Sequence, residues 1–505
     1  MKWIACFVVP LIALSFTGTG FAQSPHPWPM FRHDASRTAA STLPGPADPS
    51  LIWSYNPIPS VGGVFSTAAV SSGGRVYVGA FDNNLYCLTS RGALQWSYAT
   101  EFSILSSPAL GADGRVHIGS FLNLYSLTSS GSLTWSYNCN TGGPIESSPT
   151  LGMDGSVYIG SKSDNLFSLS SSGSLAWSYR SGENIDSSPA LGSDGRVCFG
   201  AEDNNVYVLL PAGSLSWSYT TGDSISSSPA VAGDGRAYIT GDDNVQYAFA
   251  PAGSLSWSYG VETGAPAFLN SSPALTGDGR LYVSSSDDNF YSFTSSGSLA
   301  WSFRTAVPLF ASPVVGADEV AYTGGFNGVL YAFNSNGTLM WTYTADTGIA
   351  LSSNVALGNG KRIFLSSLAY FGGGGLQCIS ERPPSLDLIP SSNSPAVGDP
   401  FTVDVTVKPI GGAFDAWSVI LAPGGKKFSF NLSRPSSLRD GMSRLASNVP
   451  GLEQPFSGRL LSLTAIPPGA AGTYTIIVGL VPTGRQPTIA NAIPDYLDQE
   501  VVVIH

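Results

Sequence analysis

One pattern constrains this chain more than any other: a tryptophan, nearly always followed by Ser-Tyr or a close variant, returns about every 41 residues. The eight copies are Trp53, Trp96, Trp135, Trp177, Trp217, Trp257, Trp301 and Trp341. Two further markers, of the types Ser-Ser-Pro-Ala-Leu and Leu-Tyr-Ser-Leu, also occur eight times each. A repeat of this length is typical of the four-stranded blades of a β-propeller. The sequence therefore predicts an all-β fold with an eight-bladed β-propeller.

Each repeat divides into four short strands, A to D, separated by turn residues that accept a positive φ. In the third repeat the expected strands are Ser147–Leu151, Val157–Gly160, Leu166–Leu169 and Leu175–Tyr179. Strand A is rich in small residues and contains Pro149, which suits an innermost edge strand where blades crowd at the axis. The tryptophan of strand D supplies a large apolar body for the wider gap between blades.

The repeats also predict how the ring closes. The eighth repeat has strands A to C at Ser352–Leu357, Arg362–Ser366 and Gly375–Ile379, but no Trp-Ser-Tyr strand follows it. The first such segment, Leu51–Tyr55, precedes the first repeat and has no blade of its own. We therefore expect this N-terminal segment to serve as strand D of blade 8, which would fasten the ring and cover its open edges.

The two ends of the chain differ from the repeats. Lys2, the apolar run 3–16 and the small residues before position 23 predict a secretory signal peptide over residues 1–22, followed by a lead-in over 23–50. The propeller is expected over 51–380 and a linker over 381–396. Residues 397–505 contain further strand patterns between Gly/Pro turns and predict an immunoglobulin-like β-sandwich. The expected strands there are 401–408, 416–421, 427–432, 459–465, 473–481 and 500–504.

Composition excludes several classes of function. Only 11% of the residues are charged and the net charge is −11, so the chain has no electrostatic footprint for nucleic acid. No segment after the signal peptide has the roughly 18 apolar residues of a membrane-spanning helix. We therefore expect an exported protein, periplasmic or at the cell surface. The cysteines Cys87, Cys139, Cys198 and Cys378 have no metal-ligand spacing and are expected to be buried, with their disulfide status open.

The repeats resemble those of quinoprotein-type, or PQQ-like, β-propellers. The resemblance rests on the strand-D tryptophans, the Ser-Ser-Pro-Ala strand, the Asp-Gly-Arg-Val hairpin at 194–197 and the segment Trp-Pro-Met-Phe-Arg-His-Asp at 28–34. It covers residues 28–380. It implies similarity both to quinone-dependent alcohol and glucose dehydrogenases and to a non-enzymatic propeller lipoprotein family of the outer-membrane barrel-assembly machinery.

This sequence departs from the enzymes in the family. Their cofactor lies beneath a ring formed by two adjacent cysteines, beside a Glu/Asn/Asp calcium site, and this chain has no adjacent cysteine pair. Its four histidines, His26, His33, His117 and His505, offer few general bases, and His117 is expected to be structural. We therefore expect no catalysis, no PQQ and no metal. Asp-Asn and Asp-Asp pairs, such as that at Asp203, are expected to form turns rather than calcium loops.

Alignment of the eight blades divides one face of the ring. The first column, at the start of strand A, is Phe65, Leu105, Glu146, Asp186, Ser226, Asn270, Phe310 and Leu351. The second column, just after strand B, is Phe81, Phe121, Lys162, Glu202, Asp242, Ser286, Phe326 and Leu368. Antiparallel pairing makes the columns neighbours, and both are aligned as apolar in blades 7, 8, 1 and 2 but polar in blades 3 to 6.

An exposed apolar patch with aromatic anchors is typical of a binding site. The expected partner-binding residues are Phe65, Phe81, Phe102, Leu105, Phe121, Phe310, Phe326, Leu351, Leu368 and Phe371. We therefore expect a non-catalytic binding or scaffold protein that holds a protein partner or an extended ligand on this face. Two alternatives stay open: a PQQ-dependent dehydrogenase, and a purely structural envelope or surface protein. The chain itself could also cover the patch.

Overall fold

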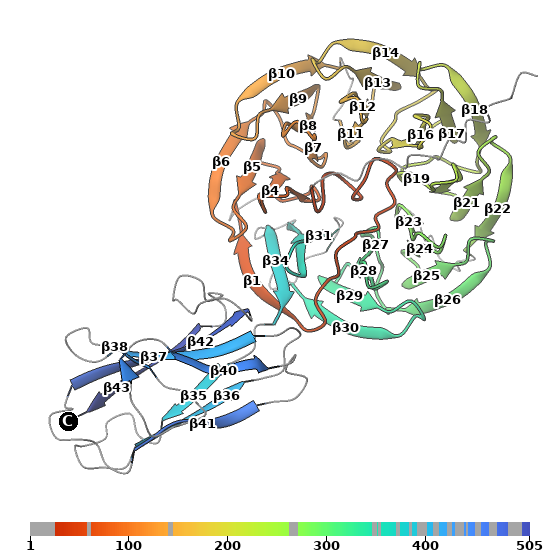
Figure 1. The fold of residues 1–505 in the computed structure, drawn as a ribbon. Coiled ribbons are helices and arrows are strands. Elements are labelled where there is room, and N and C mark those ends of the chain that lie inside the picture. The colour runs from red at the N-terminus through yellow and green to blue at the C-terminus, as the bar shows by residue number, and fades with distance from the viewer. Residues whose placement is uncertain are drawn as a thin grey trace, which may run out of the picture. The chain divides into compact units, whose positions relative to one another are not determined.

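The computed structural model describes residues 26–57, 62–139, 145–261, 271–345, 351, 355–369 and 374–382, together with the strands that follow residue 385. For residues 62, 368–369 and those later strands, only the course of the backbone is described. The chain divides into two compact units, Met1–Glu381 and Arg382–His505. In the described residues the regular structure consists of strands (Figure 1). The described residues contain no helix long and apolar enough to cross a membrane.

The first unit is the predicted eight-bladed propeller, with eight four-stranded antiparallel sheets. The innermost strands A are β3 (Ala69–Val70), β7 (Ala109–Leu110), β11 (Thr150–Leu151), β15 (Ala190–Leu191), β19 (Ala230–Val231), β23 (Ala274–Leu275), β27 (Val314–Val315) and β31 (Ala356–Gly358). The strands B are β4 (Val76–Gly79), β8 (Val116–Ser120), β12 (Val157–Gly160), β16 (Val197–Gly200), β20 (Ala237–Thr240), β24 (Leu281–Ser284), β28 (Ala321–Gly324) and β32 (Arg362–Ser366).

The strands C are β5 (Asn84–Leu88), β9 (Asn123–Leu127), β13 (Asn165–Leu169), β17 (Asn205–Leu209), β21 (Val245–Phe249), β25 (Asn289–Phe293), β29 (Val329–Phe333) and β34 (Leu376–Glu381). The outer strands D are β6 (Leu94–Ala99), β10 (Leu133–Asn138), β14 (Leu175–Arg180), β18 (Leu215–Thr220), β22 (Leu255–Gly260), β26 (Leu299–Arg304) and β30 (Leu339–Thr344). Blade 8 takes its strand D from β1 (Pro49–Tyr55), which pairs with β34 and confirms the predicted closure.

The core lies between the blades, because the strands B and C are buried on both faces of each sheet. This is why these strands are almost continuously apolar rather than alternating. The repeated Ser-Ser of strand A has a structural role here. The backbone N–H of Ser107 donates to Ser148 Oγ in the next blade at 2.9 Å, and Ser148 N–H donates to Ser188 Oγ at 2.8 Å. A ladder of serines thus links neighbouring blades close to the axis.

The lead-in runs across the centre of the ring, along the ends of the innermost strands. The backbone N–H groups of Leu110, Leu191 and Val231 donate to the lead-in carbonyl oxygens of Pro29, Ala35 and Ser36 at 2.7–2.9 Å. The fully buried guanidinium of Arg37 donates to the carbonyl oxygens of Ser148 and Pro189 at 2.8 and 3.0 Å. Arg32 is also fully buried and donates to the carbonyl oxygen of Pro273.

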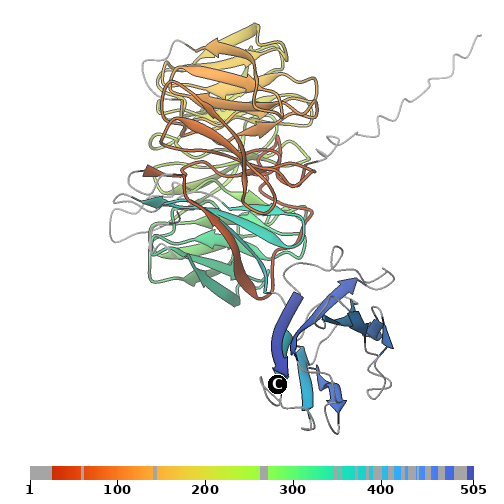
Figure 2. The ribbon, with the colours of Figure 1, turned by 90° about the vertical axis from the view of Figure 1, so that its left-hand side faces the viewer.

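The ring therefore has two different faces. On the lead-in face, strand A ends and the A–B and C–D hairpins turn. On the opposite face, which we call the loop face, strand A begins and strand B ends. A short ribbon of β2 (Gly62–Gly63) and β33 (Leu368–Ala369) joins blades 1 and 8 on the loop face. Figure 2 shows the ring from its edge, with this ribbon on the side away from the lead-in.

In the second unit, β35 (Leu386–Pro390), β36 (Phe401–Val407) and β41 (Phe456–Leu463) form one sheet. A second sheet contains β37 (Phe414–Leu421), β38 (Lys427–Ser429), β39 (Arg439–Asp440), β40 (Ser443–Val449), β42 (Gly472–Pro482) and β43 (Leu497–Ile504). β35 lies inside the stretch predicted as a linker, and β40 was not expected. The immunoglobulin-like interpretation of this unit stays a prediction.

Candidate functional site

The two aligned columns lie side by side on the loop face, and backbone hydrogen bonds hold them there. Within blade 1, Phe81 N–H donates to the carbonyl oxygen of Gly63, two residues before Phe65, at 3.3 Å. Between blades 1 and 2, Ile104 N–H donates to the carbonyl oxygen of Ala80 at 3.2 Å. Equivalent bonds recur in other blades. In the described residues the columns therefore follow one another in a band around the axis.

In the apolar blades the column residues meet as aromatic pairs. The rings of Phe65 and Phe81 are 6.0 Å apart and edge-to-face, and those of Phe310 and Phe326 are 5.6 Å apart in the same arrangement. In blade 2 it is Phe102, rather than the column residue Leu105, whose ring contacts Phe121, at 4.6 Å. Such pairs hold each other's rotamers and present a preformed surface.

Most of the expected binding residues are accessible. Phe326 is 52% exposed and Phe102 is 43% exposed, with Phe65 and Phe310 close behind, whereas Phe81, Leu105 and Phe121 are half-buried. We call these seven residues the aromatic arc. Leu368 occupies the second column of blade 8 and pairs with Gly63, but its side chain lies outside the described residues. Phe371 also lies outside them.

Leu351 does not belong to this surface, because it is only 1% exposed and packs in the core. Its N–H donates to the carbonyl oxygen of Gly325, the same bond that Ile104 makes to Ala80. A Cβ on Gly324 would meet Leu351 Cβ at 2.7 Å, as one on Gly79 would meet the side chain of Ile104. The alignment of blade 8 was therefore wrong by one residue, and the first-column position there is Ser352, outside the described residues.

In the polar blades the column residues form ion pairs and hydrogen bonds instead. Lys162 Nζ lies 2.8 Å from Glu146 Oε1 in its own blade and 3.3 Å from Asp186 Oδ2 in the next blade. Further round, Glu202 accepts a hydrogen bond from Asn184 at 2.8 Å, and Asp242 accepts one from Ser226 at 2.9 Å. We call Glu146, Lys162, Asp186, Glu202 and Asp242 the acidic arc.

Two carboxylates of the acidic arc are strained electrostatically. Burial, with the nearby carboxylate of Glu146, raises the pKa of Asp186 to about 7 despite the contact with Lys162. Burial also raises the pKa of Asp242. The Oδ1 atoms of both residues are buried and have no hydrogen-bond partner among the described residues. Because a buried oxygen without a donor makes ionisation costly, burial favours the protonated form of both side chains.

The Asp-Asn and Asp-Asp pairs form turns, as the sequence indicated. Asp203 Oδ1 accepts the N–H of Asn205 at 3.1 Å, and its other oxygen accepts the hydroxyl of Tyr207 at 2.6 Å. The intervening Asn204 has φ +67°. Asp82, Asp243 and Asp287 make the same two contacts. These aspartates therefore hold the B–C turns of their own blades.

The residues that the structure describes do not fit a quinoprotein calcium site. Ca²⁺ takes six to eight oxygen ligands, whereas Glu146 and Asp186 on this face already share the ammonium group of Lys162. Within the described ranges, no three His, Cys, Asp or Glu residues are grouped to hold a metal. His117 is buried beside Trp135, and burial lowers its pKa to about 4, which suits a neutral structural histidine.

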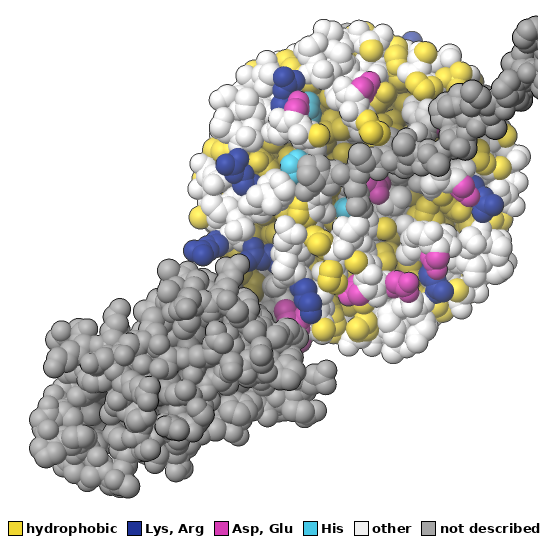
Figure 3. All heavy atoms as spheres, in the orientation of Figure 1, with side chains coloured by type: hydrophobic (Ala, Val, Ile, Leu, Met, Phe, Trp, Pro, Cys, Tyr) yellow, Lys and Arg dark blue, Asp and Glu magenta, His cyan; other side chains and the backbone are white. Residues whose placement is uncertain are grey.

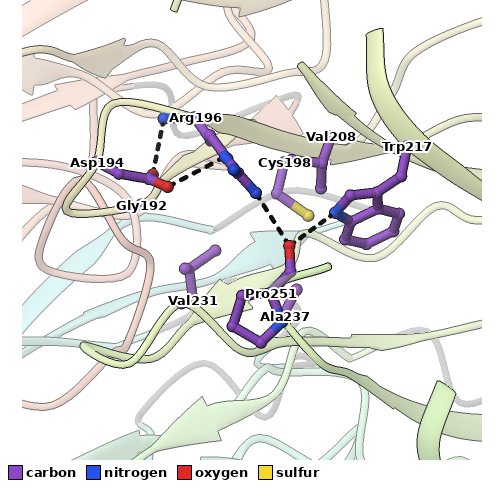
Figure 4. Close-up of a pocket in the computed structure, with 10 residues that line it drawn as sticks. Gly192, Asp194, Arg196, Cys198, Val208, Trp217, Val231, Ala237 and Pro251 are labelled. Carbon is purple, nitrogen blue, oxygen red and sulfur yellow. Dashed lines mark hydrogen bonds and ion pairs between the residues drawn. The ribbon is translucent and has the colours of Figure 1, made fainter. Parts of the chain in front are cut away.

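A small cavity between blades 4 and 5 also has a structural explanation. It holds about 30 Å³ and is lined by Cys198, Trp217, Pro251 and neighbours (Figure 4). Arg196 Nη1 and Trp217 Nε1 both donate to the carbonyl oxygen of Pro251, at 3.0 and 3.2 Å. The same pair of hydrogen bonds recurs between other blades, so these residues hold neighbouring blades together. The volume of the cavity suits about one water molecule rather than a cofactor.

The lead-in face differs from the loop face. Arg115, Arg196 and Arg236 each pair with the aspartate of their own hairpin, at 3.1–3.4 Å. Figure 3 shows this face, with such charged pairs spread around the ring. At these three hairpins the charges are therefore compensated locally.

Comparison with known proteins supports the propeller. A family model described as outer membrane protein assembly factor BamB matches residues 44–184, 122–265 and 241–382. No curated protein matches the sequence.

Solved structures are similar in fold. Quinohemoprotein alcohol dehydrogenase from Comamonas testosteroni has a TM-score of 0.59 at 15% identity, covering 73% of this chain and 83% of that one. A europium-containing methanol dehydrogenase has a TM-score of 0.57 at 13% identity, with 69% and 90% covered. BamB from Moraxella catarrhalis has a TM-score of 0.54 at 16% identity, with 66% and 99% covered. At these identities the likeness concerns the fold alone.

Proposed function

Because this chain belongs to the PQQ_2 family, described as outer membrane protein assembly factor BamB, we propose that it is an exported, non-catalytic binding protein. Its loop face would hold a protein partner or an extended ligand. The family description supports a role among other polypeptides, since an assembly factor must contact what it assembles. The predicted signal peptide supports a periplasmic or cell-surface location.

The aromatic arc carries this proposal. Four phenylalanines of the arc are 36–52% exposed, and they belong to blades 7, 1 and 2. The chain as a whole has few charges. Single exposed apolar residues are ordinary, but several exposed aromatic pairs on one face of a ring are typical of a binding surface. Each ring is already fixed by a second ring, so little rotamer entropy would be lost on binding.

The proposal is tested by affinity capture from the native envelope with Phe81→Asp/Phe326→Asp. The two carboxylates would place charge in the centre of the contact, and we expect the captured partner to be lost while circular dichroism and the thermal midpoint stay near wild type. The matched control is Leu133→Asp/Leu215→Asp, at residues that are 46% and 45% exposed on the outer strands β10 and β18. Equal capture by wild type and both variants would contradict the proposal.

The alternative function is a PQQ-dependent dehydrogenase, which the shared fold of the dehydrogenase structures favours. It is tested by adding PQQ and Ca²⁺ to the purified protein and measuring dye reduction with alcohols and sugars. Activity that depends on both additions would establish this alternative. A purely structural envelope protein would show neither activity nor a partner.

A further inference from the structure

The aromatic arc and the acidic arc are continuous. Ile145 N–H donates to the carbonyl oxygen of Phe121 at 2.9 Å, across the boundary between blades 2 and 3. The next residue, Glu146, begins the acidic arc and contacts Lys162. A ligand that covers the aromatic rings of blades 1 and 2 and extends along the band therefore passes directly onto carboxylates.

The acidic arc has a clear excess of negative charge. Its columns hold Glu146, Asp186, Glu202 and Asp242 against Lys162, and the exposed Glu183 and Asp223 lie in the loops that lead into the same strands A. The nearby Arg180 is engaged by Asp164 at 3.2 Å. On the lead-in face, by contrast, Asp113, Asp194 and Asp234 are each paired with the arginine of their own hairpin.

Among the described residues, two of these carboxylates also have one oxygen without a donor. The buried Oδ1 atoms of Asp186 and Asp242 accept no hydrogen bond within the described part of the chain. The Asp186 side chain is only 14% exposed, so water compensates it poorly. An arriving ammonium or guanidinium group would offset this negative charge from the accessible side of the arc, where Glu146 is 38% exposed, and charge-assisted hydrogen bonds are the stronger kind.

We infer that the loop face binds a polypeptide segment in which aromatic or branched apolar side chains stand beside lysine or arginine side chains. This inference rests on the proposed function and specifies the chemistry of its partner. The apolar side chains would pack on the aromatic arc, and the cationic ones would reach the acidic arc. Arginine suits the boundary well, because its guanidinium group can also stack on a phenylalanine ring.

Other occupants fit the band less well. Nucleic acids, anionic lipid surfaces and acidic peptides would be repelled by the acidic arc. A wholly apolar segment that spanned both arcs would remove Asp186 and Asp242 from water without providing a charge, which costs free energy. Charge complementarity therefore selects a cationic, apolar polypeptide.

The test is selection of a random 12-residue peptide library displayed on phage against the immobilised full chain at low salt. We expect the enriched peptides to combine Phe, Trp, Leu or Ile with Lys or Arg. Binding of a synthetic enriched peptide, measured by calorimetry, should weaken about tenfold in Glu202→Gln/Asp242→Asn, and it should also weaken as salt is raised. Both amides can still accept the hydrogen bonds from Asn184 and Ser226.

The matched control is Asp154→Asn/Asp234→Asn, which removes the same charge from hairpins on the lead-in face and should leave binding unchanged. Enriched peptides without cationic residues, or peptides lost in Phe81→Asp/Phe326→Asp but unaffected by Glu202→Gln/Asp242→Asn, would overturn this inference and leave the proposed function standing. Peptides indifferent to both double variants would bind elsewhere and contradict both. If no peptide is enriched, the inference that the loop face binds a polypeptide segment is wrong. The proposed function is then tested separately by the capture experiment.

Discussion

Trp177 of blade 3 lies directly on Gly213 of blade 4, so closely that a Cβ on this glycine would be 2.5 Å from the indole carbon Cδ2. Gly213 has φ +85°, a conformation that glycine adopts without strain. The indole N–H donates to the carbonyl oxygen of Pro211 in the same turn, at 3.0 Å. The glycine of each C–D turn therefore packs directly against the tryptophan of the preceding blade.

This relationship predicts that Gly213→Ala destabilises the propeller more than a positive φ alone would. Gly114→Ala is the matched control, because Gly114 has φ +80° but nothing within 4 Å of an added Cβ. We expect a loss of about 1–2 kcal/mol in the control from backbone strain, and about 1–3 kcal/mol more in Gly213→Ala from displacing the indole. Urea unfolding followed by tryptophan fluorescence measures both, and equal losses would contradict the tight contact.

Asp186 predicts a pH dependence of stability. Its pKa is raised to about 7 in the folded protein, chiefly by burial, against an ordinary aspartate pKa of 3.8. Between these values the folded state holds a proton that the unfolded state has released, so stability falls as pH rises from about 4 to 7, by at most about 1.4 kcal/mol per pH unit for one proton.

The measurement is the unfolding midpoint of wild type and Asp186→Asn from pH 4 to 8. The amide does not titrate, so the variant should gain stability relative to wild type as pH rises through this window, in spite of losing the contact with Lys162. A difference between the two proteins that stays constant with pH would show that Asp186 does not titrate there.

We predict that Arg37 anchors the lead-in to the ring. Its buried guanidinium serves carbonyl oxygens of Ser148 and Pro189, and Arg37→Met would leave these acceptors without it. We expect a loss of about 3 kcal/mol and much faster cleavage of residues 26–50 by thermolysin. Arg196→Met is the control, because that half-exposed side chain donates to one carbonyl oxygen at the rim. Equal protease resistance in all three proteins would count against an anchoring role.

The cysteines predict slow thiol chemistry in the folded state. Cys87, Cys139, Cys198 and Cys378 are all buried, as expected for small core residues. Burial raises the pKa of Cys87 to about 11 and those of Cys139 and Cys198 to about 12, which lowers the thiolate fraction at pH 8. Iodoacetamide should therefore modify these residues more than about 100-fold faster in urea than in the native protein. Peptide mapping that finds rapid native labelling or a disulfide would refute this.

The period of the sequence was sufficient to predict the fold. Strand β12 has the predicted bounds Val157–Gly160, and the pairing of β1 with β34 follows from a marker that had no blade of its own. The contact of Phe65 with Phe81 was also predictable, because antiparallel pairing must bring the start of strand A beside the end of strand B.

Other features depend on packing that no local pattern encodes. Leu351 was misplaced because blade 8 has Val355 where most repeats have proline, and its burial becomes apparent only from its contact with Gly324. The burial of Arg32 and Arg37 could not be predicted from the sequence. Their partners are backbone carbonyl oxygens of distant blades, and no side-chain pattern reveals such partners. The contact of Phe102 with Phe121 arises from the course of a loop.

The pairing of β1 with β34 also determines when the ring can close during synthesis. β1 is the first strand of the ring to be synthesised, and its partner is the last. Seven blades can form from neighbouring hairpins as the chain emerges, but the eighth joins the two ends of the propeller sequence and must wait for both. A chain that stops anywhere before residue 376 therefore keeps an unpaired strand edge. A closed ring therefore shows that synthesis has passed β34, whatever the state of the unit that follows it.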